Sequence, residues 1–275
     1  MASGRHAGRR RGPLTYVRRF VAIAYLSLLV VWPVSLVVQR TFADGLTSLR
    51  KVFNDPVATH ALKLTVMVSI IAVLCNLVFG VGMSLLLVRY RFPGRRLLSA
   101  LVDLPLSVSP IVVGLALVLV YNPRTGWFGP TLDDAGIQVL FANPAIVMAT
   151  VFVSLPLVVR EVVPVLEEIG IEQEQAASSL GASPWQTFRR ITLPSIKWAV
   201  VYGVVLSLAR SLGEFGAVKI VSGNVVKRTQ TASLVVEQQY QNFRQTSAYA
   251  MSFLLAAASI LCIIIVSFLR PKTEK

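Results

Sequence analysis

Two ionisable side chains, Arg210 and Glu214, lie inside one of the most apolar parts of this 275-residue chain. They are four residues apart, so on a helix they share one face and can partly neutralise each other. At 1.5 Å of rise per residue, they lie about 22–28 Å along the apolar run that begins near Ser195. A charge at such depth is costly and usually faces the protein interior or a watery path. The sequence leaves two interpretations open, a structural ion pair or a gate that contacts an anion in transit.

Arginine is suited to anion contact because its planar guanidinium matches a tetrahedral oxyanion. Hydroxyl donors along the same path are expected at Ser107, Ser109 and Ser207, although serines in helices more often bond to their own backbone. The predicted translocation residues are therefore Arg210, Glu214, Ser107 and Ser109. No cluster of His, Cys and carboxylate residues supports a membrane enzyme.

The composition is that of an integral membrane protein. Hydrophobic residues make up 55% of the chain and charged residues 15%, against about 25% charged in globular domains. The net charge of +14 comes from cations that flank apolar runs, so a nucleic-acid partner is not expected. Cys75 and Cys262 both fall within apolar runs, and we expect no disulfide, metal or cofactor.

About six apolar runs are long enough to cross a bilayer, which takes about 20 residues each. They lie near residues 16–38, 61–88, 97–121, 139–159, 195–221 and 248–269. The sequence thus predicts an all-α, polytopic membrane helix bundle over residues 16–270. We expect a disordered basic tail at residues 1–15 and a short tail at 271–275.

Lysine and arginine positions predict the orientation of these runs. The cations gather in both tails, after the second run and after the fourth run, all on one side of a six-span chain. Both termini and residues 160–197 are therefore expected in the cytoplasm, with the chain spanning the cytoplasmic (inner) membrane among lipids. Most of the net charge is then a topology signal and poor support for an anionic substrate.

A polar, amphipathic segment from about residue 164 to 194 separates the fourth and fifth runs. Residues 161–180 have the apolar spacing of a helix, and Gly181 lies where a helix would end in a left-handed residue. Ser183 and Gln186 form a capping-box pattern for a second short helix, with a proline at its first position.

The second helix is expected to carry Trp185, Phe188 and Ile191 on one apolar side and to end at Pro194. Exposed aromatic side chains indicate a partner surface. The alternative is a connector helix that lies on the membrane surface.

This segment resembles the coupling loop of permease subunits of ATP-binding cassette (ABC) importers, which inserts into a groove of the ATPase. The family pattern is Glu-Ala-Ala, three residues, Gly, nine residues, Ile, any residue, Leu, Pro, and this chain matches its spacing throughout. The one departure is Gln175 in place of the glutamate; Glu174 would point about 100° away on a helix and is not its equivalent. By this resemblance, the ATPase-coupling residues are Gln175, Ala176, Ala177, Gly181, Ala182, Trp185, Phe188, Ile191, Leu193 and Pro194.

Two further stretches resemble permeases of sulfate and thiosulfate importers. Residues 103–114 are more similar to the W-type subunit (CysW) than to the T-type subunit, and residues 209–224 share a pattern that molybdate permeases also carry. The resemblance covers roughly residues 16–270. It implies a type I importer permease fold and sulfate or thiosulfate as cargo.

The same resemblance implies several partner chains. The sequence has no Gly-x-x-x-x-Gly-Lys-Ser/Thr stretch that could cradle ATP phosphates, so the chain is not expected to be an enzyme. The expected partners are a cytoplasmic ATP-binding subunit dimer, a second permease subunit of the T-type and an extracytoplasmic sulfate-binding protein. Closure of the ATPase dimer on ATP would pull the coupling loops together and open the permease pair outward.

Two other functions remain as alternatives: a molybdate-type oxyanion permease of the same class, and an ion-coupled secondary carrier that uses Arg210 and Glu214 as a switchable pair. Carriers usually show internal repeats, which are not visible here. Uptake that continues after collapse of the proton gradient but stops without ATP would exclude the carrier.

Overall fold

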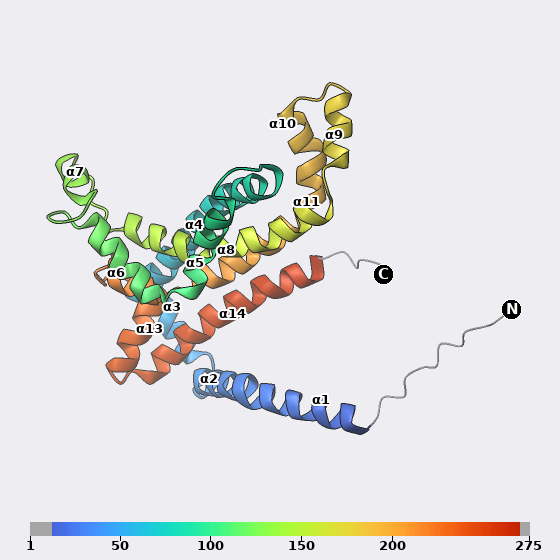
Figure 1. Cartoon of the computed structure of the whole chain (residues 1–275). Helices are drawn as coiled ribbons and strands as arrows, with labels where there is room; N and C mark the ends of the chain where they lie inside the picture. Colours follow the sequence, from blue (N-terminus) through green and yellow to red (C-terminus); the bar gives the residue numbers. More distant parts are fainter. Residues whose placement is uncertain (1–12, 270–275) are drawn as a thin grey trace.

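The computed structural model describes residues 13–269, and every regular element in that range is helical. Long helices run side by side, with α9 and α10 at one end of the molecule and α7 and α13 at the other (Figure 1). The first residues of α1 and the last residues of α14 lie towards the α9–α10 end (Figure 1). The predicted tail at 271–275 and residues 1–12 of the predicted N-terminal tail fall outside the described residues.

The first half of the described chain contains α1 (Pro13–Leu26), the π-helix η1 (Ser27–Val31), α2 (Trp32–Phe42), α3 (Thr47–Asn54), α4 (Pro56–Arg89), α5 (Arg95–Ser107), α6 (Pro110–Tyr121) and α7 (Gly129–Asp134). The second half contains α8 (Asn143–Glu168), α9 (Glu172–Ser179), α10 (Pro184–Thr187), the π-helix η2 (Phe188–Thr192), α11 (Leu193–Leu212), α12 (Gly216–Val221), α13 (Ala232–Gln241) and α14 (Gln245–Leu269).

The centre of the bundle is formed by α4, α8 and α11, which pack closely around Val158. A Cβ added to Gly80 would lie 2.8 Å from the Val158 Cβ, and one added to Gly203 would lie 2.9 Å from its Cα. Small residues let membrane helices approach closely, and close approach supplies the van der Waals contact that holds them together. These glycines therefore set the spacing of the three central helices.

A buried polar network also joins the three central helices. The Asn76 amide nitrogen of α4 donates to Ser154 Oγ of α8 at 2.8 Å and to Ser207 Oγ of α11 at 3.3 Å. Ser211 Oγ, one turn beyond Ser207, donates to Ser154 Oγ at 3.3 Å. Hydrogen bonds between helices have no competition from water in the membrane interior, so this network helps to fix how the helices pack.

The prediction of about six spans is confirmed, with one correction to the third span. Within residues 13–269, five helical stretches are long and apolar enough to cross a membrane, and a sixth span arises if α5 and α6 are counted together. These two helices are bent by 113° relative to each other, so residues 97–121 do not form one straight helix. Pro110 explains the break, because a residue before proline is driven out of the helical region; Ser109 has φ −59° and ψ 134°.

The fifth predicted span is also interrupted. Residues 195–221 do not form one helix, since α11 ends at Leu212 and α12 begins only at Gly216. Arg210 therefore lies in the last turn of α11 and Glu214 beyond its end, so the prediction that both share one helix face is wrong. The two glycines that flank this break, at 213 and 216, are the residues that resist helix continuation.

Two predictions for residues 161–194 need correction. The helix predicted over residues 161–180 is broken: α8 ends at Glu168, Gly170 takes a positive φ of 64°, and α9 begins at Glu172. Pro194 does not end the second helix, which continues from α10 through η2 into α11. The Leu193 N–H bonds to Phe188 O, five residues back, and this wider π turn just before Pro194 accommodates the proline without a stop.

Candidate functional site

The loop between α9 and α10 turns sharply at Gly181. Its φ of +83° is a left-handed conformation that glycine adopts without strain, and the Ala182 N–H bonds back to Ala177 O at 3.0 Å to close the end of α9. Ser183 Oγ then accepts from the Gln186 N–H while the Gln186 side chain accepts from the Ser183 N–H. The predicted helix, turn and capped second helix are confirmed at this corner.

The corner presents large apolar side chains outward. Leu180 is 89% exposed and Trp185 is 67% exposed, and both lie beside the Gly181 turn. The Trp185 ring lies over Phe188 with centroids 5.6 Å apart, and Phe188 in turn packs against the buried core that includes Val158 and Ile196. The exposed Trp185 side chain is therefore supported by Phe188, which contacts the buried core of the helix bundle.

The remaining predicted coupling residues divide by exposure. Gln175, Ala176, Gly181 and Pro194 are exposed, whereas Ala177, Ala182, Phe188, Ile191 and Leu193 are half-buried. The structure brings all of them to one end of the bundle, around α9, α10 and η2 (Figure 1).

Arg89 and Glu174 were not singled out by sequence reasoning as partners, yet they meet beneath this loop. Arg89 Nε lies 2.9 Å from Glu174 Oε2, and Thr192 Oγ1 donates to Glu174 Oε1 at 2.8 Å. Gln175 is exposed, whereas its neighbour Glu174 is half-buried and makes contacts within the chain.

A second candidate region surrounds the break between α11 and α12. Arg210 Nη1 lies 2.9 Å from Glu214 Oε2, so the predicted ion pair forms although the helix has ended between them. The Glu214 side chain is only 2% exposed, whereas that of Arg210 is 39% exposed. Glu214 Oε1 also accepts from the Ala217 N–H at 3.1 Å, which satisfies a free donor at the start of α12.

The two helix breaks touch each other. A Cβ added to Gly216 at the α11–α12 break would lie 3.1 Å from the Cβ of Pro110 at the α5–α6 bend. A Cβ added to Gly114 would lie 2.8 Å from the Ile220 Cβ, so α6 and α12 also pack closely. Tertiary structure thus joins the two separate stretches that carry the resemblance to oxyanion permeases.

Ser107 and Ser109 both lie at the α5–α6 bend and are exposed. Ser109 precedes α6, and its backbone oxygen accepts from the N–H groups of Val112 and Val113. Ser207, by contrast, is fully buried in the polar network with Asn76. Of these three serines, Ser107 and Ser109 have exposed side chains and Ser207 does not.

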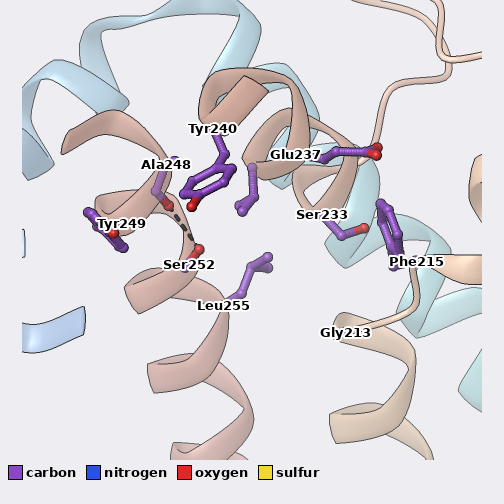
Figure 2. A pocket seen from close by; sticks show the side chains of 10 residues that line it. Gly213, Phe215, Ser233, Glu237, Tyr240, Ala248, Tyr249, Ser252 and Leu255 are labelled. Atoms are coloured by element: carbon purple, nitrogen blue, oxygen red, sulfur yellow. Dashed lines mark hydrogen bonds between the residues drawn. The ribbon is translucent and has the colours of Figure 1, made fainter. Parts of the chain in front are cut away.

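An open cavity of about 480 Å³ lies beside the α11–α12 break, between α13 and α14 (Figure 2). Gly213 and Phe215 border it from the break. Its serines already have acceptors, since Ser252 donates to Ala248 O at 2.9 Å and Ser233 donates to Glu214 O at 2.7 Å. The cavity therefore presents mainly aromatic and aliphatic surface.

Comparisons with known proteins agree with this architecture. Residues 76–275 match the family described as "Binding-protein-dependent transport system inner membrane component". A solved bacterial ABC transporter involved in the import of alginate superposes with a TM-score of 0.78 at 18% identity, over 95% of this chain and 96% of that chain. That likeness establishes the fold.

Relatives at higher identity narrow the family. The sulfate transport system permease protein CysW of Synechococcus elongatus is 44% identical over 93% of this chain and 89% of its own length. The CysW protein of Escherichia coli is 41% identical over 90% of this chain, and the CysT protein of the same organism is 38% identical over 91%.

The family match, the relatives and the fold together define an inner-membrane permease subunit of a binding-protein-dependent ABC importer. Within that class, the chain belongs to the sulfate transport permeases of the CysW type. Permease subunits of this family are transporter components and not enzymes.

Proposed function

We propose that this chain forms half of the membrane pathway of an ATP-driven importer of sulfate or thiosulfate. One observation carries the proposal most directly: the outward Leu180 and Trp185 at a corner held by Gly181 and a complete capping box. A rigid apolar projection of this kind is suited to insertion in a groove of an ATPase subunit. The sulfate cargo rests on the relatives, which are sulfate permeases.

The proposed complex contains a cytoplasmic dimer of ATP-binding subunits, a second permease of the T-type and an extracytoplasmic sulfate-binding protein. A solved alginate transporter in complex with a periplasmic protein has the same fold, which supports the last of these partners. Residues 16–270 would form the permease domain, residues 164–194 the coupling loop, and both tails would lie in the cytoplasm. In Figure 1 the start of α1 and the end of α14 lie towards the same end of the molecule as this loop, which supports placing all three on one side of the membrane.

The proposed pathway passes the two touching helix breaks. Glu214 is buried and holds Arg210 at one side, while part of the guanidinium remains accessible to an oxyanion. Ser107 and Ser109 lie at the other break and would add hydroxyl donors. Such contacts are weak enough for release, and tight capture is left to the binding protein.

Labelled sulfate uptake by the assembled complex in liposomes tests the function. Uptake should require internal ATP and the binding protein, should continue with the proton gradient collapsed, and should be lowered by excess thiosulfate. Competition by molybdate but not by thiosulfate would place the chain with molybdate-type permeases instead. Uptake without ATP would exclude the ABC mechanism.

A further inference from the structure

Coupling helix α9 has little apolar attachment to the rest of the chain. Within the described residues, α9 has no fully buried side chain. A cavity of about 280 Å³ lies between it and the end of α4, bordered by Arg89, Glu174 and Ser178 among others. Packing alone therefore does not link this helix to the membrane core.

Arg89 and Glu174 bridge that gap with a shielded, two-contact ion pair. Besides the Nε contact of 2.9 Å, Arg89 Nη2 donates to Glu174 Oε1 at 3.1 Å. The side chains are only 12% and 21% exposed, so solvent and salt screen the pair weakly. The Nη2–Oε1 hydrogen bond is charge-assisted, and together with the Nε contact it limits the relative orientation of the two groups.

The same pair reaches two further elements. Arg89 Nη1 donates to Leu166 O at 3.0 Å, in the last turn of α8, where backbone carbonyls lack helical partners. Thr192 in η2 donates to Glu174 Oε1 at 2.8 Å. The charges suit these positions, because a cation is favourable at a helix C-terminus and a carboxylate at a helix N-terminus.

We propose that the Arg89–Glu174 ion pair is the contact that transmits movement of α9 to α4 and α8. The inference rests on the proposed coupling of this loop to an ATPase. Because α4 and α8 form the centre of the bundle, a displacement of α9 would reach the polar network around Asn76 through this contact. Without the pair, α9 could tilt on the ATPase while the central helices stay in place. Arg89 and Glu174 are thus positioning residues for transport.

The test uses the complete transporter in liposomes, with binding-protein-stimulated ATP hydrolysis and sulfate uptake measured together. In Glu174→Gln, uptake per ATP hydrolysed should fall about tenfold while thermal stability and co-purification of the ATPase are retained. The matched control is Glu167→Gln, which removes an exposed cytoplasmic pair with Arg95 of 3.8 Å and should leave the ratio unchanged. A purely structural role would lower stability without changing uptake per ATP.

A double-mutant cycle completes the test. Arg89→Gln should cause a similar loss, and the double variant Arg89→Gln/Glu174→Gln should be no worse than either single change, because both remove the same contact. Three outcomes would each overturn the inference. They are unchanged uptake per ATP hydrolysed in Glu174→Gln, losses that multiply in the double variant, and loss of the ATPase from the complex.

Failure of the proposed function has a different signature. If the unaltered complex imports no sulfate, the sulfate assignment is wrong. Stimulation of ATP hydrolysis by the binding protein then still reports whether the Arg89–Glu174 contact transmits movement. The inference requires that this stimulation be altered in Glu174→Gln but not in Glu167→Gln.

Discussion

Two arginine–glutamate pairs have the same closest N–O distance of 2.9 Å. Arg89–Glu174 lies beside the α9–α10 loop, and Arg210–Glu214 lies at the break between α11 and α12. In the first pair both side chains are shielded, and the partners come from separate helices. In the second only the glutamate is buried, and the partners are four residues apart. The first pair joins separate helices, whereas the second leaves its arginine partly exposed.

The helix break around Glu214 and the loop corner around Gly181 also differ in how much of their side-chain surface is buried. Around Glu214, buried side chains and close backbone contacts dominate, so substitutions there should lower stability. Around Gly181, the large side chains face outward, so substitutions there should lower transport more than stability. The experiments below test this contrast.

Among the polar and glycine positions compared, the largest loss of stability is expected at Glu214. Glu214→Ala leaves Arg210 without its carboxylate and the Ala217 N–H without an acceptor, which should cost about 3 kcal/mol. Chemical unfolding of the purified permease in detergent measures this. Glu214→Gln keeps the amide oxygen for Ala217 and should lose less; equal stability of Glu214→Ala and the unaltered protein would show that the pair is not structural.

Gly181→Val should have an intermediate effect on stability and a strong effect on transport. A β-branched residue at φ +83° costs about 1–2 kcal/mol and distorts the corner that carries Trp185. We expect normal membrane insertion but loss of coupling between ATP hydrolysis and uptake. Gly181→Asn is the matched control, since asparagine tolerates this conformation. Normal uptake by Gly181→Val would remove the loop from the mechanism.

Asn76→Ala should produce a smaller loss, about 0.6–1 kcal/mol, because hydrogen bonds within membranes add modestly to stability. It removes the donor to Ser154 and Ser207. Ser69→Ala is the control, since the buried Ser69 hydroxyl has no hydrogen-bond partner within the described chain. If both variants unfold alike, the network does not hold the central helices.

The smallest effect on stability is expected at Leu180. Leu180→Ala should change the unfolding free energy by less than about 0.5 kcal/mol, because this side chain is almost fully exposed. It should nevertheless weaken ATPase binding in a pull-down with the purified subunit.

Leu166→Ala is the opposite case, because Leu166 is fully buried. The unfolding free energy of this variant should fall by about 2–5 kcal/mol.

Local sequence signals predicted the loop corner well. A capping box and a glycine C-cap depend on neighbouring residues only, so Ser183, Gln186 and Gly181 could be placed without knowledge of the fold. Signals for two misplaced boundaries were also present: Gly170 marks the end of α8, and the glycines at 213 and 216 mark the break after α11.

Other features could not be predicted from single segments. Pro110 indicates a break, but neither the 113° angle nor the close packing of α6 against α12 can be read from this segment alone. The partners of Glu174 are Arg89, 85 residues away, and Thr192, 18 residues away. No local sequence pattern links Glu174 to Arg89.

The sequence by itself determined the number of apolar spans, the turn at Gly181 and the coupling-loop spacing, because hydropathy and backbone capping act over a few residues. Tertiary structure alone decided that two broken helices meet beside Arg210 and that Glu174 faces inward to Arg89. Those contacts join residues far apart in the chain, and they form only when whole helices have packed and the buried polar groups have found partners.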